Sequence, residues 1–285
     1  MTAGSVAEAA SHGNRAAART ATSSTAVRLG RLGFVARGAV YVIVGWLALR
    51  AAVAGEGTAT DKQGALEAIA QQPMGVILLV AVTLGLFAYA AWSLVRAVFD
   101  PERRGHDAGG LVARGGNAVA TLSYGGLALA AANLVTGSGS AGRGSDASTQ
   151  DWTAHVLSAP LGPVLVIAIG VAFFAVATTE FIKAYTGSFR KYLSLGGLGS
   201  ELRMWIVRVG RMGLVARGVV FALIGLFLIQ ASRHQDAGEA VGLGGALQKL
   251  AEQPYGQVLL GVVAAGLVMY GLFSFVEARY RRLRQ

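Results

Sequence analysis

The sequence contains no cysteine and few charged residues. Among its 285 residues only 14% are Asp, Glu, Lys or Arg, whereas 54% are hydrophobic. The absence of Cys excludes disulfides, thiolate metal sites, iron–sulfur clusters and cysteine catalysis. Ordinary globular domains carry about 25% charged residues. The composition therefore argues against a soluble chain.

Histidine is also scarce, and no catalytic constellation is visible. The four His residues lie outside the apolar runs, so we expect no haem at bilayer depth and no other cofactor. Asp151 and His155 are spaced as half a metal site, but no third ligand accompanies them. The Gly-rich stretches carry no phosphate-binding lysine and follow no strand. We expect neither a metal site nor an enzyme.

Residues 1–27 have no continuous apolar stretch of the kind that a secretory signal requires. We expect this segment to be a disordered cytoplasmic tail.

Six apolar segments follow, each long enough to span a bilayer core of about 30 Å, which takes about 20 helical residues. They predict an all-α membrane protein with six transmembrane helices. The predicted spans are Gly33–Val53, Met74–Val98, Gly116–Val135, Leu161–Ala184, Gly213–Ala231 and Tyr255–Ala278.

Basic residues are distributed unevenly between the two sides of the predicted spans. With the N-terminus inside, 20 of the 25 Lys and Arg residues fall on the inner side. The positive-inside rule therefore places both termini in the cytoplasm. The excess of 21 Arg over 4 Lys is typical of a GC-rich bacterial genome, so we expect the bacterial plasma membrane. The basic residues are explained by orientation and contact with anionic lipids, so nucleic acid is not an expected partner.

The chain repeats itself at a fixed offset. Residues 28–50 match residues 208–230 at 10 of 23 positions, and residues 64–98 match residues 245–279 at 16 of 35. A diverged middle copy keeps equivalents of Arg31, Gly33 and Tyr41 in Arg114, Gly116 and Tyr124. We therefore expect three two-helix repeats over residues 28–104, 105–190 and 191–285.

Each repeat has the same plan of a first span, a short amphipathic outer helix, a Pro-x-Gly joint and a second span. Proline is tolerated in the first turn of a helix because its missing N–H would be unpaired there. The short helices are expected around Gly64–Gln72, Asp151–Ala159 and Gly245–Gln253. All three repeats cross the membrane in the same sense, which predicts pseudo-threefold symmetry about the membrane normal.

The repeated Arg-x-Gly-(Phe/Leu)-Val-Ala-Arg-Gly opening, the Gln-Pro-x-Gly joint and the triplicated hairpin resemble the "domain of unknown function 1206" family of bacterial membrane proteins. The resemblance covers about residues 28–280. It implies a multi-pass membrane protein, and it implies no reaction, ligand or catalytic residue.

Repeat alignment places polar residues of the second spans at equivalent positions near their cytoplasmic ends. If these helices face the axis, the residues ring a cytoplasmic mouth as a charged gate or ion site; the alternative is ordinary ion pairs that pin the helix ends. Glu277 has Arg96 and Lys183 as expected partners. The candidate cluster is Ser93, Arg96, Glu180, Lys183, Ser274 and Glu277.

Arginines of the first and third repeats form a second candidate set. Arg37 and Arg217 lie about one turn inside their spans, from which depth a long side chain can snorkel to the headgroups. With Arg31 and Arg211 they are candidate contacts to lipid phosphate, or plain snorkelling anchors. Repeated aromatic positions are expected to pack or to line a path: Tyr41, Tyr124, Phe221, Tyr89 and Tyr270.

Polar residues are sparse between the two membrane surfaces, which favours a structural or partner-binding membrane component. The expected partners are membrane lipids and other membrane proteins. The alternative is a small transporter or channel with an axial path gated at the cytoplasmic mouth, which rests on the parallel repeats alone.

Overall fold

The structure is a computed structural model that describes residues 24–54, 62–99, 108–136 and 145–281, and these are almost entirely helical. The predicted all-α class is therefore confirmed. The helices are α2 Ser24–Ala54, α3 Lys62–Ala70, α4 Gly75–Phe99, α5 Ala108–Thr136, α6 Ser145–Leu157, α7 Gly162–Thr186, α8 Ser200–His234, α9 Leu243–Ala251 and α10 Gly256–Tyr280, with 3-10 turns η1 Ser188–Tyr192 and η2 Ala237–Glu239.

In the part of the chain that the structure describes, six helices are long and apolar enough to cross a membrane, and each overlaps one of the six predicted spans; the fifth begins at Ser200, before the predicted Gly213. The spans are Gly30–Val53, Gly75–Val98, Arg114–Thr136, Gly162–Thr186, Ser200–His234 and Gly256–Tyr280. The three short helices between the spans of each repeat, α3, α6 and α9, are also present. We call the side on which α2 begins and α10 ends the basic side.

The start of α2 corrects one expectation. The helix begins at Ser24, so residues 24–27 are helical and not part of a disordered tail. No Pro or Gly lies between Ser24 and Leu29 to end the helix there. The rest of that prediction, residues 1–23, lies outside the described residues.

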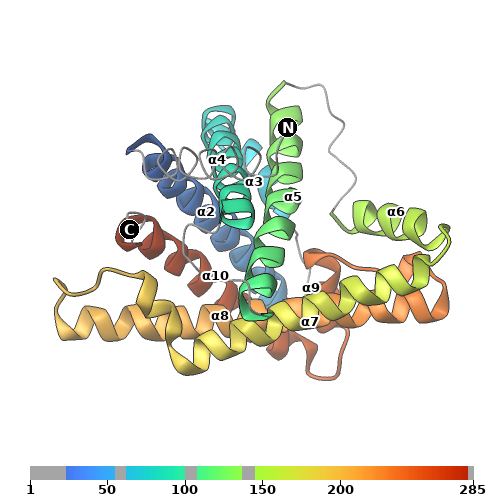
Figure 1. Cartoon of the computed structure of the whole chain (residues 1–285). Coiled ribbons are helices and arrows are strands. Elements are labelled where there is room, and N and C mark those ends of the chain that lie inside the picture. Colours follow the sequence, from blue (N-terminus) through green and yellow to red (C-terminus); the bar gives the residue numbers. More distant parts are fainter. Residues whose placement is uncertain (1–23, 55–61, 100–107, 137–144, 282–285) are drawn as a thin grey trace, which may run out of the picture.

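The six spans assemble as three helix pairs, and each pair joins two different repeats. The most extensive helix contacts are between α2 and α10, between α7 and α8, and between α4 and α5. Figure 1 shows these three pairs, with α7 and α8 side by side along the lower edge. The repeats are therefore interleaved around a common centre, in the cyclic order that pseudo-threefold symmetry requires.

Within the first and third repeats the two spans cross with their backbones in close contact. A methyl group on Gly33 would lie 2.6 Å from Cα of Tyr89, and one on Gly213 would lie 2.6 Å from Cα of Tyr270. Small residues permit this approach in membranes, where lipid supplies no hydrophobic drive between helices. Equivalent residues of repeats 1 and 3 thus make the same crossing.

The second repeat departs from this arrangement. Its spans α5 and α7 make few contacts with each other, and a methyl group on Gly116 would lie at an ordinary 3.8 Å from Cγ2 of Val176. Its helices pack on the other repeats instead, α5 on α4 and α7 on α8. The helix contacts between different repeats therefore follow the threefold pattern, whereas the contact between the two spans of the second repeat does not.

The Pro-x-Gly joint has the same unusual backbone in all three repeats. Its middle residue has a positive φ although it is bulky and exposed: 64° for Met74, 65° for Leu161 and 60° for Tyr255. Non-glycine residues adopt this left-handed conformation at a cost of about 1 kcal/mol or more. The repetition shows that the joint constrains how each second span begins.

Glycine is required at the third position of the joint. A methyl group on Gly75 would lie 2.2 Å from the carbonyl oxygen of Ala70, and one on Gly256 would lie 2.0 Å from that of Ala251. These neighbours are backbone atoms at the end of α3 and α9, so they cannot move aside without displacing the outer helix.

We predict that Gly75→Ala and Gly256→Ala each destabilise the protein by about 2 kcal/mol or more, the upper range for overpacking. The measurement is the midpoint of thermal unfolding of the purified protein in detergent. Gly126→Ala is the control, because nothing lies within 4 Å of the added methyl group. An unchanged midpoint in the two joint variants would contradict the steric account.

Candidate functional site

Two arginines at equivalent positions, Arg37 on α2 and Arg217 on α8, point into the helix bundle. Only 4% of Arg37 is exposed, and 17% of the Arg217 side chain is exposed. The expectation that these two arginines reach lipid phosphate or snorkel to headgroups was therefore wrong. Neighbouring helices supply acceptors for them inside the bundle. Arg31 and Arg211 are exposed, and for them the prediction of a lipid-phosphate contact stays open.

Arg37 binds to groups on two other helices. Its Nη1 donates to the Tyr89 hydroxyl on α4 at 2.7 Å. Its Nε and Nη2 donate to Oγ of Ser274 on α10, at 3.2 Å and 3.0 Å. Its Nη2 also pairs with the carboxylate of Glu277 on α10. Arg37 therefore connects both spans of its own repeat to the third repeat.

The Arg37 guanidinium is also enclosed by aromatic rings. Its Cζ lies 4.9 Å from the ring centre of Phe34, 5.0 Å from that of Tyr89 and 5.1 Å from that of Tyr270. A cation at this distance from an aromatic face is attracted by the ring quadrupole, more strongly where water is excluded. The site thus surrounds the buried cation with hydrogen-bond acceptors and aromatic rings.

Arg217 makes the equivalent connection between the third and second repeats. Its Nη1 lies 3.3 Å from Oε1 of Glu180 on α7, and Lys183 donates to the same oxygen at 2.9 Å. Glu180 therefore also pairs with Lys183, three residues later on the same helix. The partner that the sequence did not predict is Arg217, which approaches from the neighbouring repeat.

The second repeat has Ala120 where the other repeats have Arg37 and Arg217. The helix that faces it, α4, carries Ser93 and Arg96, and Nη2 of Arg96 donates to Oγ of Ser93 at 3.4 Å. All three equivalent residues of the expected inner ring thus contact a guanidinium. Ser274 and Glu180 contact an arginine of a first span, Arg37 and Arg217. Ser93 instead contacts Arg96 of its own second span, because the facing first span has Ala120.

Glu277 has two ion-pair partners that repeat alignment did not suggest. Its carboxylate pairs with Arg37 and with Arg281, which follows one turn later at the end of α10. The partners suggested by repeat alignment were Arg96 and Lys183. Because α10 packs against α2, Glu277 reaches the arginine of α2 directly. The charge of Arg96 on α4 also acts on its carboxylate.

The repeated aromatic residues form a layer next to the charged groups, on the side away from the basic surface. Tyr41 packs edge-on against Tyr270 with ring centres 4.8 Å apart, and Tyr124 packs likewise against Tyr89 at 4.6 Å. Phe221 meets Phe173, one turn from the equivalent Val176, at 5.7 Å. The Tyr41–Tyr270 and Phe221–Phe173 pairs join the same two helices as the ion pairs of Arg37 with Glu277 and of Arg217 with Glu180.

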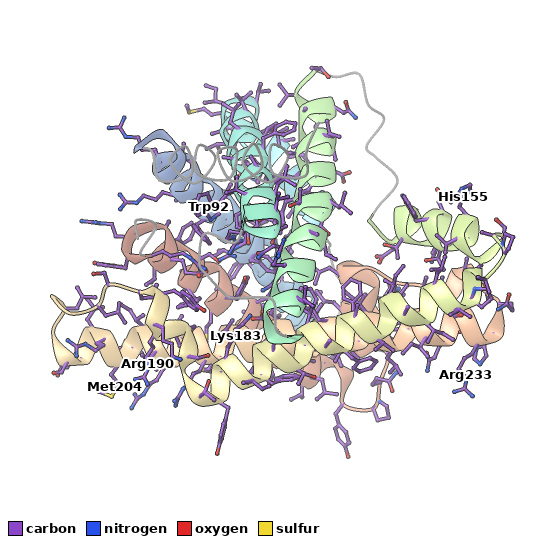
Figure 2. All side chains as sticks on the ribbon, viewed as in Figure 1. Trp92, His155, Lys183, Arg190, Met204 and Arg233 are labelled. Carbon is purple, nitrogen blue, oxygen red and sulfur yellow. The ribbon has the colours of Figure 1, made fainter. Side chains whose placement is uncertain are left out.

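These residues together form an interior ionic cluster, which we define as Arg37, Arg96, Glu180, Lys183, Arg217, Ser274, Glu277 and Arg281. Figure 2 shows Lys183 toward the middle of the molecule, well away from His155 on α6. Within the described ranges, no three His, Asp or Glu side chains converge to hold a metal ion. Chemically, the cluster joins three repeats through ion pairs and hydrogen bonds inside an apolar bundle.

The sequence predicted six polar residues at or next to this cluster, but it did not predict that Arg37 and Arg217 pair with acids of other repeats. A signal was present, since both arginines occur at the same depth in two repeats, one turn before an aromatic residue. What the sequence lacked was the pairing of α2 with α10 and of α8 with α7.

Three interleaved hairpins with paired charges in the interior define a six-span, triple-repeat membrane protein. The chain belongs to the family described as "Domain of Unknown Function (DUF1206)", whose profile matches residues 32–100, 115–187 and 212–281. It is 34% identical to the "Uncharacterized protein YxxB" of Bacillus subtilis (strain 168) over 256 residues, which cover 90% of this chain and 91% of that protein. No solved structure matches the chain.

We predict that Arg37→Met destabilises the protein by about 3 kcal/mol or more, because removing one partner of a buried ion pair leaves the other uncompensated. Thermal unfolding in detergent measures the effect, and Arg31→Met at an exposed position is the control. The double variant Arg37→Met with Glu277→Gln should lose less than the sum of the two single changes, since the residues are in contact. Additive losses would show that the pair is not energetically coupled.

Proposed function

We propose that the protein is a partner-binding component of the bacterial plasma membrane, which holds a transmembrane helix of another membrane protein in a groove between α5 and α7. The observation that carries the proposal is the open hairpin of the second repeat. Its inner face is exposed where the same face of the other repeats is buried.

Equivalent residues of the first spans differ in burial in the way that an open groove requires. Val119 on α5 is 45% exposed, whereas its equivalents Ala36 and Ala216 are each 5% exposed. One turn further along, Ser123 is exposed, whereas its equivalents Val40 and Val220 are buried. On the facing helix Ala172 is exposed as well. The exposed face between α5 and α7 therefore presents Val119, Ser123 and Ala172.

Two substitutions explain why this hairpin is open. In the first repeat Gly85 would place a methyl group 2.5 Å from Cβ of Ala36, and the third repeat has the same contact, at 2.4 Å, between Gly266 and Ala216. The second repeat has Ala172 and Val119 at these positions, so both sides of the contact are larger. The added carbon atoms occupy the space into which the two backbones would have to move.

A helix is the occupant that fits this surface. In repeats 1 and 3 the equivalent surface already binds a helix, at the crossings of Gly33 with Tyr89 and of Gly213 with Tyr270. On α5, Gly116 lies on the same side as Val119 and Ser123, and a methyl group on it would have only Cγ2 of Val176 within 4 Å, at 3.8 Å. Glycines on a helix surface allow a second helix to approach closely.

A different membrane protein is a better source for this helix than a second copy of the chain. Close packing in the groove requires a partner helix with a face of small residues. The exposed faces of α4 and α7 carry bulky residues such as Ile77, Leu84, Leu165 and Val171. The small faces of α2 and α10 are occupied by each other inside the bundle. The outward face of α5 carries small residues too, but the exposed Leu122 and Leu129 interrupt it.

The burial of the interior ionic cluster favours a rigid, supporting role of the protein over transport along the axis. Arg37, Ser93, Glu180, Ser274 and Glu277 are all buried. Transport along the axis would have to break the pairs of Arg37 with Glu277 and of Arg217 with Glu180 in an apolar environment, where a charge without a partner is costly.

The location is part of the proposal. The uneven distribution of Lys and Arg supports an orientation with both termini in the cytoplasm, and the Bacillus subtilis relative supports a bacterial source. Under this orientation the basic side faces the cytoplasm.

The test is photo-crosslinking of the full chain in the membrane, with a photoreactive amino acid at Ser123. We expect an adduct with a second polypeptide. The closing variant Val119→Ala with Ala172→Gly gives the second repeat the residues of the other two, and it should lower the adduct yield severalfold because the hairpin can close.

Controls separate the groove from the lipid-facing surface. The same probe at Leu122, on the outward face of α5, should give no such adduct. Ala118→Gly with Val171→Ala removes the same atoms from exposed positions outside the groove and should leave the yield unchanged. Adducts with lipid alone, or an adduct of twice the mass of the chain, would overturn the proposal of a foreign helix.

A further inference from the structure

A separate cavity of about 570 Å³ lies on the basic side, at the junction between α7 and α8. It is formed by the end of α7, the 3-10 turn η1 and the loop that leads to Ser200. Its volume is within the range of small-molecule sites, about 300–1,000 Å³. None of its residues belongs to the groove of the second repeat or to the interior ionic cluster.

The chain around this cavity is held in place by backbone contacts. Gly187 ends α7 in the left-handed conformation, with φ of 66°, and its N–H bonds to the carbonyl of Lys183 at 2.9 Å. Further along, the N–H of Ser194 bonds to the carbonyl of Tyr280 at 2.8 Å, which ties the loop to the end of α10. The cavity is therefore shaped before any ligand binds.

The lining is strongly basic. Arg190, Lys191 and Arg203 contribute to it together with the hydroxyl residues Thr186 and Ser188, and no Asp or Glu is part of the lining. Three cations around one cavity repel one another unless an anion lies between them. The charge of the lining thus specifies a negatively charged ligand.

The guanidiniums of Arg190 and Arg203 are both held by hydrogen bonds to carbonyl groups of this loop. Nε of Arg190 donates to the carbonyl of Gly187 at 3.2 Å, and Nη2 of Arg203 donates to the carbonyl of Leu198 at 3.2 Å. A guanidinium has five N–H donors in a planar fork, so these bonds leave donors for a ligand. Planar forks and hydroxyls suit the tetrahedral oxygens of a phosphate group.

The cavity lies where the headgroups of a membrane would be. Its lining includes Thr186, the last residue of the fourth span, and Arg203 in the first turn of the helix that carries the fifth span. Tyr185 and Trp205 are exposed close by in the chain, and such aromatic residues are enriched at membrane interfaces. Figure 2 shows Arg190 and Met204 together at one end of the α7–α8 pair, with Arg233 at the other end.

We propose that this cavity binds a phosphate group through Arg190, Lys191 and Arg203. The group is carried by an anionic phospholipid of the same leaflet or by a soluble phosphate compound. The site is distinct from the partner groove, and it does not depend on the function proposed above.

The test uses the full chain in nanodiscs of phosphatidylcholine with and without phosphatidylglycerol, and native mass spectrometry counts the phosphatidylglycerol retained after gentle release. The variant Arg190→Gln with Arg203→Gln should retain severalfold less. The matched variant Arg208→Gln with Arg279→Gln removes the same charge from exposed positions on the same side and should retain as much as the unaltered protein.

A second arm adds millimolar inorganic phosphate before release. Retention that phosphate does not reduce identifies the lipid headgroup as the source, and retention that phosphate abolishes identifies a soluble phosphate compound; both support the site. If the double variant does not fold, Lys191→Gln at an exposed position replaces it, with a smaller expected loss. Equal losses in the test and matched variants, or no loss in either, would overturn the proposal.

Discussion

The close approach of two backbones at the hairpin crossing is the constraint on which the rest of this structure depends. Helices in a bilayer gain little from burying apolar side chains, because lipid is equally apolar, so they associate through tight contact of small residues. Gly33 against Tyr89 is such a contact. Arg37 lies one turn from Gly33 on the same helix, so the crossing also brings the guanidinium to the Tyr89 hydroxyl.

Charges inside the bundle are a consequence of how the pairs are interleaved. A lone arginine at this depth would be costly, and each of the two arginines of the first spans is offset by a carboxylate from another repeat. Replacing such pairs by apolar residues is often neutral for stability, whereas breaking them is not. The pairs therefore contribute chiefly to specificity, since they favour the arrangement in which α2 meets α10 and α8 meets α7.

The second repeat shows the effect of losing the contact between small residues at the hairpin crossing. With Val119 and Ala172 in place of Ala and Gly, α5 and α7 separate, and each keeps only its contact with a neighbouring repeat. The arginine of the first span is lost at the same time, and Arg96 replaces it at Ser93. The hairpin of the second repeat thus keeps its contacts with the neighbouring repeats without closing on itself, and the face between α5 and α7 stays exposed.

The sequence by itself determined the six spans, the three repeats and the Pro-x-Gly joint. Hydropathy, period and turn residues are local properties, and repetition strengthens each of them. Only the tertiary structure decided which helix packs on which, and so which acid Arg37 meets and which hairpin is open. Those outcomes depend on contacts between residues up to 240 positions apart in the chain. A difference of one or two methyl groups, as at Val119 and Ala172, acts only where two backbones meet.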